Sequence, residues 1–286
     1  MQSQAMQGKV VLITGATSGI GKVTAVTLAD MGATMVVLGR NAEKGKELLE
    51  EITLRTGSNS IDFIRCDLAS LDTVKEAATD FKSRYDRLDV LIDNAGGING
   101  KRMTTKDGFE YTFGVNHLAH FVLTNRLLDL LKTSAPSRAV VTSSAAHLSG
   151  HIDFDDLMAE KKYTAFKAYG QSKLANVLFT FELARRTQGT RVTANCLHPG
   201  AVRSNFAKGM GGAVSGFYTI FGVFMKSPEQ GAQTMIYLAS SPEVESVTGK
   251  YFAKSKLKAS SPESTNQAQA RRLWEISEQL TKKWLA

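Results

Sequence analysis

A tyrosine and a lysine stand four residues apart in the segment Tyr169-Gly170-Gln171-Ser172-Lys173. In a helix, this spacing places both side chains on one face, a turn apart. A phenol with a pKa of about 10 exchanges protons poorly near neutrality, but a neighbouring ammonium stabilises the phenolate and lowers that pKa. The pair therefore predicts a general acid and base. Helices also carry Tyr and Lys at this spacing by chance, so the prediction depends on the other segments.

A second candidate is the glycine-rich segment Thr14-Gly15-Ala16-Thr17-Ser18-Gly19-Ile20-Gly21, between an apolar run and a helical pattern. Its glycines allow positive φ angles, let the backbone approach a pyrophosphate and let the helix pack close to a sheet. The N–H groups and dipole of that helix would then face the phosphates. Ordinary tight turns share this pattern, but its position at the first strand–helix junction favours dinucleotide binding.

The end of the second apolar run bears on which dinucleotide is bound. Sites specific for NAD carry Asp or Glu near this point, whereas this chain has Gly39-Arg40-Asn41. A carboxylate would repel a 2′-phosphate, and a guanidinium binds one through charge-assisted hydrogen bonds. Lys22, just after the glycine turn, could add charge. We therefore predict NADP(H) rather than NAD(H), with the alternative that Arg40 is only a solvated loop residue.

The elements that must position these residues alternate regularly along the chain. Short runs rich in Val, Ile and Leu predict buried strands, and longer segments with helical period and capping residues predict helices. The expected strands are 9–14, 34–39, 61–65, 88–93, 138–143 and 191–197. The expected helices are 20–31, 41–56, 71–85, 108–134, 166–186, one that opens at Pro228, and one over about 265–286.

Strands that are apolar throughout are typical of parallel sheets buried on both faces. Repeated strand–helix–strand units then predict an α/β chain with a doubly wound parallel sheet and helices on both faces, the Rossmann fold. No linker, repeat or low-complexity tract interrupts the pattern, so residues 1–286 are interpreted as a single domain. In the last helix, Leu273, Trp274, Ile276 and Leu280 form an apolar stripe that we expect to pack on this domain, with an oligomer contact as the alternative.

Composition argues against several other classes of protein. The 35 Lys and Arg and 27 Asp and Glu give a net charge of +8, but the cations are scattered among the acids, which disfavours nucleic acid as a partner. Cys66 and Cys196 are too few for a disulfide framework and lack neighbours at metal-ligand spacing, so we expect a reducing compartment and no metal. The first residues show no signal pattern, and no run reaches the roughly 20 apolar residues of a membrane span. The chain is therefore expected to be soluble and cytoplasmic.

Taken together, these motifs resemble those of the short-chain dehydrogenase/reductase family over nearly the whole chain, from Gly8 to about Leu280. The resemblance rests on segments that follow the family's order: TGATSGIG at 14–21, Asp67-Leu68, Asn94-Ala95-Gly96, Asn116 in FGVNHLAHF, Ser144 in VVTSSAAH, YGQSK at 169–173, and His198-Pro199-Gly200-Ala201-Val202.

The resemblance implies four catalytic residues. Tyr169 would be the general acid in reduction and the general base in oxidation. Lys173 would bind the nicotinamide ribose hydroxyls and lower the pKa of Tyr169. Ser144 would hydrogen-bond the substrate oxygen and stabilise its developing charge. Asn116 would hold the helix that anchors a proton-relay water.

It also implies a cofactor site in which Asp67 and Leu68 contact adenine, Asn94–Gly96 line the dinucleotide, and Pro199–Val202 with Ser204 meet the nicotinamide amide. With Arg40 and Asn41 included, the expected cofactor-binding residues are Gly15, Thr17, Ser18, Gly19, Ile20, Gly21, Arg40, Asn41, Asp67, Leu68, Asn94, Ala95, Gly96, Tyr169, Lys173, Pro199, Gly200, Val202 and Ser204.

Several of these residues have a purely structural alternative. Asp67 could merely cap a turn, and Asn116 could be a satisfied polar residue within its helix. Ser143 competes with Ser144, because adjacent strand residues point to opposite faces. Ser144 is preferred because it directly precedes Ala145-Ala146, as in the family pattern.

Some segments depart from the family pattern. The stretch between Ser144 and Tyr169 is longer than usual, the motif NNAG begins with Asp93 here, and Ser204 stands where threonine is expected. The long stretch, together with the segments KLAN at 173–176 and ARRLW at 270–274, looks most like the retinol dehydrogenase and WW-domain oxidoreductase branch. Light-dependent protochlorophyllide reductases are more distant relatives. Many retinoid enzymes carry an N-terminal membrane anchor, and we do not expect one from the first residues of this sequence.

The substrate lid of the family corresponds to residues 204–227, where stretch 206–225 includes Phe217, Tyr218, Phe221 and Phe224 among glycines. Such a loop can close over a site and exclude water, and its aromatic side chains favour an apolar substrate. Alternatively, the rings pack against the domain or a neighbouring subunit. His147 and His151 in the long stretch could face the pocket, but such histidines are more often solvated, and neither is assigned any chemistry.

The sequence thus predicts an NADP(H)-dependent oxidoreductase that transfers a hydride between nicotinamide and a carbonyl or alcohol of a small lipophilic substrate, such as an aldehyde, a ketone or a retinoid-like molecule. One alternative is a non-catalytic dinucleotide-binding sensor or scaffold, which the intact set Asn116, Ser144, Tyr169 and Lys173 argues against. Another is a C=C reductase of a tetrapyrrole pigment. Many members of the family assemble, so the resemblance implies a homodimer or homotetramer.

Overall fold

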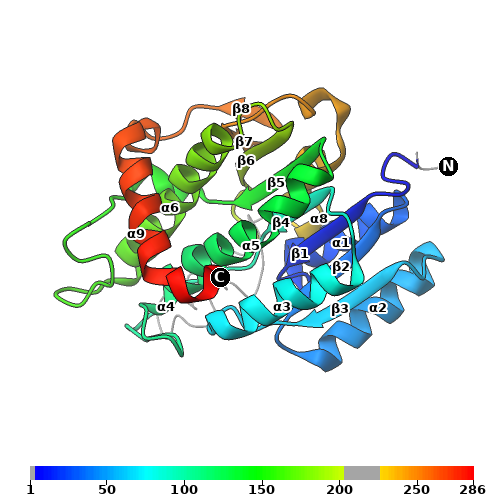
Figure 1. The fold of residues 1–286 in the computed structure, drawn as a ribbon, viewed down its shortest axis with the longest axis horizontal. Coiled ribbons are helices and arrows are strands. Elements are labelled where there is room, and N and C mark those ends of the chain that lie inside the picture. Colours follow the sequence, from blue (N-terminus) through cyan, green and yellow to red (C-terminus); the bar gives the residue numbers. More distant parts are fainter. Residues whose placement is uncertain (1–3, 203–225) are drawn as a thin grey trace.

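The computed structural model describes residues 4–202 and 226–286, which are built around an eight-stranded sheet (Figure 1). Its strands are β1 Val10–Thr14, β2 Thr34–Gly39, β3 Ile61–Arg65, β4 Val90–Asp93, β5 Ser137–Thr142, β6 Val192–His198, β7 Lys250–Ala253 and β8 Lys256–Lys258. Their order is β3-β2-β1-β4-β5-β6-β7-β8, with parallel pairing from β3 to β7 and antiparallel pairing of β8 on β7. The direction of winding reverses between β1 and β4, the point at which such folds bind ligands beyond the carboxyl ends of the strands.

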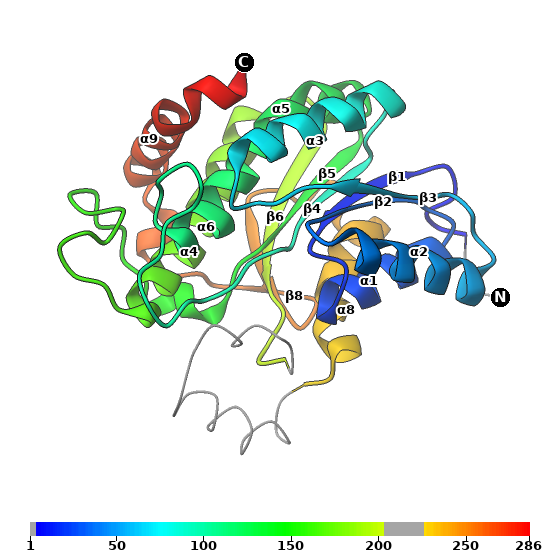
Figure 2. The same ribbon diagram turned by 90° about the horizontal axis from the view of Figure 1, so that it is seen from below.

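Helices cover both faces of the sheet (Figure 2). One face carries α1 Gly19–Asp30, α2 Ala42–Thr56 and α8 Pro228–Ser240. The other carries α3 Leu71–Arg84, α5 Ala119–Thr133 and α6 Ala165–Arg186, and α9 Gln267–Leu285 packs on α6 and α5. This arrangement confirms the predicted α/β architecture, a doubly wound and mostly parallel sheet between two layers of helices.

The strands are apolar throughout because both of their faces are buried. In β1, Val11 and Ile13 pack into the core under α1 and α8, whereas Leu12 packs into the core under α3 and α5. All three side chains have no solvent exposure. A continuous apolar run, rather than an alternating one, is the pattern that a parallel strand between two helical layers requires.

The helix expected over 108–134 is less regular than predicted. Glu110 caps the short helix α4 Tyr111–Phe113 by accepting hydrogen bonds from Thr112 N (2.8 Å) and Phe113 N (2.7 Å). The segment Gly114–Leu118 is π-helical, and α5 follows directly. A single π turn leaves little trace in hydrophobic periodicity, so the sequence could not reveal it.

The hairpin of β7 and β8 was also absent from the predicted elements. All three residues of β8 are exposed, and two of them are lysines. A short, charged edge strand has no apolar run by which it could be recognised, and these features protect an edge from pairing with another chain.

The apolar stripe of α9 packs on the domain, as predicted. Leu273 is 1% exposed and Trp274 is 4% exposed. The Trp274 ring centroid lies 4.9 Å from that of Phe121 on α5 and 5.7 Å from that of Phe179 on α6. The C-terminal helix therefore completes the core on this side of the sheet.

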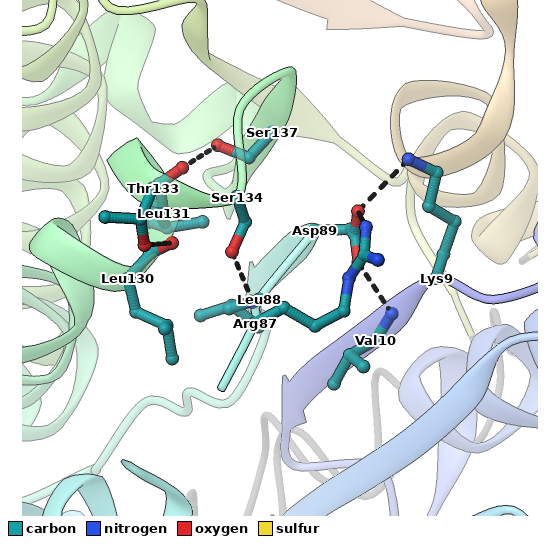
Figure 3. Close-up of polar contacts among 10 residues, drawn as sticks. All are labelled: Lys9, Val10, Arg87, Leu88, Asp89, Leu130, Leu131, Thr133, Ser134 and Ser137. Atoms are coloured by element: carbon teal, nitrogen blue, oxygen red, sulfur yellow. Dashed lines mark hydrogen bonds and ion pairs between the residues drawn. The ribbon is translucent and has the colours of Figure 1, made fainter. Parts of the chain in front are cut away.

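A buried carboxylate joins β1 to β4 at their amino ends, remote from the edge at which ligands bind. Asp89, 2% exposed, accepts hydrogen bonds from Lys9 Nζ (3.1 Å), Val10 N (2.9 Å), and Arg87 Nε and Nη2 (2.9 and 2.6 Å) (Figure 3). Burial opposes ionisation, but the hydrogen bonds from Arg87, Val10 N and Lys9 outweigh it and hold the pKa of Asp89 below its ordinary value. The ionised carboxylate therefore stabilises this end of the sheet.

Candidate active site

The glycine turn is held against the end of β4 by a network of hydrogen bonds. Thr14 Oγ1 accepts from Asn94 N and Ala95 N, both at 2.9 Å, and Asn94 Nδ2 donates to Thr14 O (2.8 Å) and Gly15 O (3.2 Å). Gly15 has a φ of +68°, and a Cβ at Gly21 would lie 2.5 Å from Gly15 O. Both positions therefore require glycine, one for its backbone conformation and the other for the close approach of α1 to the turn.

The end of β2 lies beside this turn. A Cβ at Gly39 would lie 3.4 Å from Thr17 Cγ2. Arg40 and Asn41 follow with exposed side chains, and Asn41 Oδ1 caps α2 by accepting from Lys44 N at 2.8 Å. Arg40, whose side chain is exposed, therefore directly follows a residue that lies beside the glycine turn.

Two further charged residues of this region have protein partners. Lys22, expected to add positive charge, forms an ion pair with Glu51 on α2. Asp67, after β3, accepts from Ala69 N (3.1 Å) and pairs with Lys106 (3.4 Å). The contacts of Asp67 are therefore those of a turn cap, the structural alternative considered from the sequence.

Tyr169 and Lys173 lie in the first half of α6, with Lys173 Nζ 5.7 Å from the centroid of the Tyr169 ring. Lys173 is 3% exposed, and its Nζ donates to Thr142 O at 3.1 Å. Burial lowers the pKa of Lys173 to about 8, so the charged ammonium still predominates at pH 7. The helix brings the phenol and the cation together, as the spacing predicted.

Asn116 connects the loop after β4 to α6 from within the π-helical segment. It is fully buried; its Oδ1 accepts from Gly97 N (2.9 Å), and its Nδ2 donates to Gly97 O (3.0 Å) and Ser172 Oγ (2.9 Å). A Cβ at Gly96 would lie 2.8 Å from Asn116 Oδ1 and 3.3 Å from Lys173 Nζ. These contacts join loop 96–97, Asn116 and Lys173 into one group. Only glycine fits at position 96, because a Cβ there would be too close to the Asn116 side chain.

The two serines after β5 have different partners. Ser143 Oγ is buried and donates to Lys173 O at 2.7 Å. Ser144 Oγ accepts from Ala146 N at 3.2 Å, and Ser144 is partly exposed. That contact occupies a lone pair of Ser144 and leaves its hydroxyl hydrogen able to donate to another oxygen.

Residues Pro199–Val202 follow β6 at the same edge of the sheet. A Cβ at Gly231 would lie 2.5 Å from Val202 Cγ2 and 2.8 Å from Ile20 Cγ2, so Val202 adjoins the start of α1. Ser204 and the predicted lid up to residue 225 lie outside the described residues.

Asp93, the residue that departs from the family's NNAG motif, is fully enclosed at the end of β4. Its Oδ2 accepts from Thr124 Oγ1 at 2.8 Å. Burial raises the pKa of Asp93 to about 7. The Asp93 side chain therefore joins the end of β4 to α5.

Two histidines beside Ser144 were given no role in the sequence analysis. His147 has no solvent exposure, so the prediction that it is solvated was wrong. Its Nδ1 lies 2.6 Å from Ser144 O, and its Nε2 accepts from Ser261 N at 3.2 Å. His198 Nδ1 accepts from Ala145 N at 3.2 Å.

His151, in contrast, has a side chain that is 73% exposed and pairs with Glu263 at 3.0 Å. The position in the sequence distinguishes the buried His147 from the exposed His151. His147 is three residues after Ser144, within the 3-10 turn Ala145–Ser149. A side chain at this spacing can return to the carbonyl that opens the turn.

A family model described as short chain dehydrogenase matches residues 9–212, and the chain belongs to this family. It is an oxidoreductase of CH–OH and C=O groups. Within the family it lies in the retinol dehydrogenase branch. It is 47% identical to retinol dehydrogenase 13 of Homo sapiens over 279 residues, which cover 96% of this chain and 84% of that protein. It is 46% identical to retinol dehydrogenase 14 of Homo sapiens, with 96% and 86% covered.

Solved structures agree with this assignment. An uncharacterized protein from Mycobacterium paratuberculosis superposes with a TM-score of 0.79 at 34% identity, covering 96% of this chain and 94% of that one. A short chain dehydrogenase from Shigella flexneri in complex with NADP superposes with a TM-score of 0.71 at 28% identity, covering 90% and 100%.

Two features are absent from residues 4–202 and 226–286. None of the helices there combines the length and apolar character needed to cross a bilayer. The same residues contain no group of three or more His, Cys, Asp or Glu side chains arranged to hold a metal ion.

Proposed function

We propose that this oxidoreductase uses NADP(H) to reduce a carbonyl, or oxidise the corresponding alcohol, on a lipophilic substrate of the retinoid or long-chain aldehyde and ketone type. The observation that carries the proposal is the 5.7 Å separation between Lys173 Nζ and the Tyr169 ring. The continuous sheet also supports treating residues 1–286 as one catalytic domain.

The residues present fit a phosphorylated dinucleotide. Helix α1 begins at Gly19 with no acidic residue in its first turn and no side-chain cap from Ser18, so its N–H groups are suited to a pyrophosphate. Asn94 Oδ1 is buried without a hydrogen-bond partner among the described residues, beside the same turn. Arg40 would pair with a 2′-phosphate, and Asp67 with Leu68 would border the adenine.

When bound, the nicotinamide supplies or accepts the hydride. Tyr169 donates its phenolic proton to the substrate oxygen in reduction and removes it in oxidation. Lys173 stabilises the phenolate through its positive charge, and Ser144 donates a hydrogen bond to the oxygen on which negative charge develops. Asn116 keeps loop 96–97 and α6 at a fixed separation through its three side-chain hydrogen bonds.

The direct test is NADPH oxidation measured against retinaldehyde, long-chain aldehydes, ketones and quinones, with glyceraldehyde as a small polar control. Turnover that increases with the apolar length of the carbonyl compound is expected. The names of the relatives, retinol dehydrogenases 13 and 14, make retinaldehyde the first compound to try. Tight NADPH binding without turnover of any compound would instead favour a nucleotide-binding sensor.

The choice of cofactor gives a separate prediction. Arg40→Asp should weaken NADPH binding by roughly 10–150-fold, because a charge-assisted contact contributes about 1.5–3 kcal/mol. NADH binding should strengthen, since the new carboxylate can accept from the ribose 2′-hydroxyl. Isothermal titration with both cofactors measures the change. Arg55→Asp is the matched control, because it makes the same charge change at the far end of α2, and it should leave the preference unaltered.

A further inference from the structure

His147 is enclosed between the Ser144 turn and the segment that follows β8. Its ring lies 4.6 Å from the ring of Tyr251, centroid to centroid. On one side Nδ1 lies 2.6 Å from Ser144 O, and on the other Nε2 lies 3.2 Å from Ser261 N. The imidazole therefore bridges two backbone groups that are far apart in the sequence.

The partners of His147 determine where its proton is. A backbone N–H can only donate, so Nε2 must accept from Ser261 and carries no hydrogen. A carbonyl can only accept, so Nδ1 must carry the hydrogen that is donated to Ser144 O. The ring is thus the neutral Nδ1–H tautomer, and burial favours it further by lowering the pKa of His147.

The Ser261 end of this bridge is anchored by further hydrogen bonds. Ser261 is 4% exposed; its Oγ accepts from Ser264 N (3.3 Å), and its carbonyl accepts from Ser264 Oγ (2.6 Å). Ser144 O also accepts from His147 N at 3.1 Å. Because Ser261 is held in place, the imidazole hydrogen-bonded to it is also held, and it fixes the orientation of the Ser144 peptide group.

We propose that His147 is a positioning residue that holds the Ser144 carbonyl and thereby sets the direction in which the Ser144 hydroxyl points. The inference rests on the proposed function of Ser144 as the donor to the substrate oxygen. Without the Nδ1–H donor, the Ser144 carbonyl is left with the longer 3.1 Å hydrogen bond from His147 N, so its peptide group can tilt. A misplacement on the order of 1 Å can cost about 100-fold in rate.

Three substitutions separate the two hydrogen bonds of His147. In His147→Asn, the amide nitrogen takes the place of Nδ1 and can still donate to Ser144 O. In His147→Gln, the amide reaches the place of Nε2 and keeps only the contact with Ser261. In His147→Leu, both are lost. We expect kcat to fall roughly 10–100-fold in the Leu and Gln variants and to recover largely in the Asn variant, with NADPH affinity within about twofold throughout.

His151→Leu is the control, since that histidine is exposed in the same loop, and it should leave kcat unchanged. The double variant Ser144→Ala/His147→Leu should be no slower than Ser144→Ala, because His147 acts through Ser144. Equal losses in the Asn, Gln and Leu variants that follow their melting temperatures would overturn the proposal. So would a double variant in which the two losses multiply.

A readout that does not need activity comes from NMR of the protein with ¹⁵N-labelled histidine, with the His147 signals assigned by their loss in His147→Asn. Nδ1 should be protonated and Nε2 unprotonated, with no titration near pH 6.5, the ordinary pKa of histidine. An Nε2–H tautomer or an imidazolium would overturn the inference. If the wild-type protein turns over no carbonyl compound, the proposed function fails, whereas this measurement still decides the tautomer of His147 and its two hydrogen bonds.

Discussion

Replacement of Tyr169 by phenylalanine is expected to lower kcat for carbonyl reduction by about 10²–10⁴-fold, the usual contribution of a positioned general acid. The substitution removes only the hydroxyl group, and α6, with Lys173 buried against Thr142, should be unaffected. NADPH affinity should therefore change by less than about threefold. Steady-state kinetics together with titration of NADPH would measure both effects.

Tyr163→Phe provides a matched control for this experiment. Tyr163 lies just before α6, and its hydroxyl donates to Asn99 O at 2.7 Å, so the same atom is removed close to the site. Its loss should change kcat by less than about fivefold, since a neutral hydrogen bond contributes about 1 kcal/mol. If Tyr169→Phe retained its rate, or the two variants were equally slow, the proton donor would have to be another group.

The largest effect on stability is expected from Asp89→Ala, which should lower the free energy of unfolding by about 2–4 kcal/mol. The change removes the carboxylate that Lys9 and Arg87 share, and it leaves Val10 N without its acceptor. The estimate stays below that for a fully buried pair because the Lys9 and Arg87 side chains are 38% and 46% exposed and can be hydrated. Urea unfolding at pH 7 would measure the loss.

Asp80→Ala is the control for Asp89, because both carboxylates accept two hydrogen bonds from one arginine. Asp80 accepts from Arg84 Nε and Nη2 at 2.7 and 2.6 Å, but its side chain is 36% exposed. Removal of this surface pair should cost less than about 1 kcal/mol. Similar losses in the two variants would show that burial of Asp89 contributes nothing.

The Asp89 effect should also depend on pH. Because the folded protein holds the pKa of Asp89 below its ordinary value, the stabilisation is fully present above the unfolded value of about 4. It is lost as the pH falls from there through the lowered pKa of the folded state. The difference in unfolding free energy between the wild type and Asp89→Ala should therefore shrink below about pH 4, and a difference that grew on acidification would contradict this assignment.

The elements that could be predicted from the sequence are those set by local spacing or periodicity. Strands β2 and β3 match their predicted bounds, and α2 ends at Thr56 as predicted, because apolar runs and helical periodicity are local signals. The proximity of Tyr169 to Lys173 was predictable for the same reason, since four residues on one helix are one turn apart. The glycine turn follows β1 and Asn94 follows β4. These two segments come together because β1 and β4 are neighbours in the strand order of this fold.

Only the tertiary structure determined which groups support the site. Ser261 and His147 are 114 positions apart, and Asn116 and Ser172 are 56 apart, so no periodicity could reveal that these side chains meet. The tautomer of His147 follows from the Ser261 N–H, a donor supplied by a segment beyond the last strand. The amino-acid sequence thus determined the fold and the acid–base pair through short-range geometry, whereas the contacts that orient Ser144 depend on how distant segments pack.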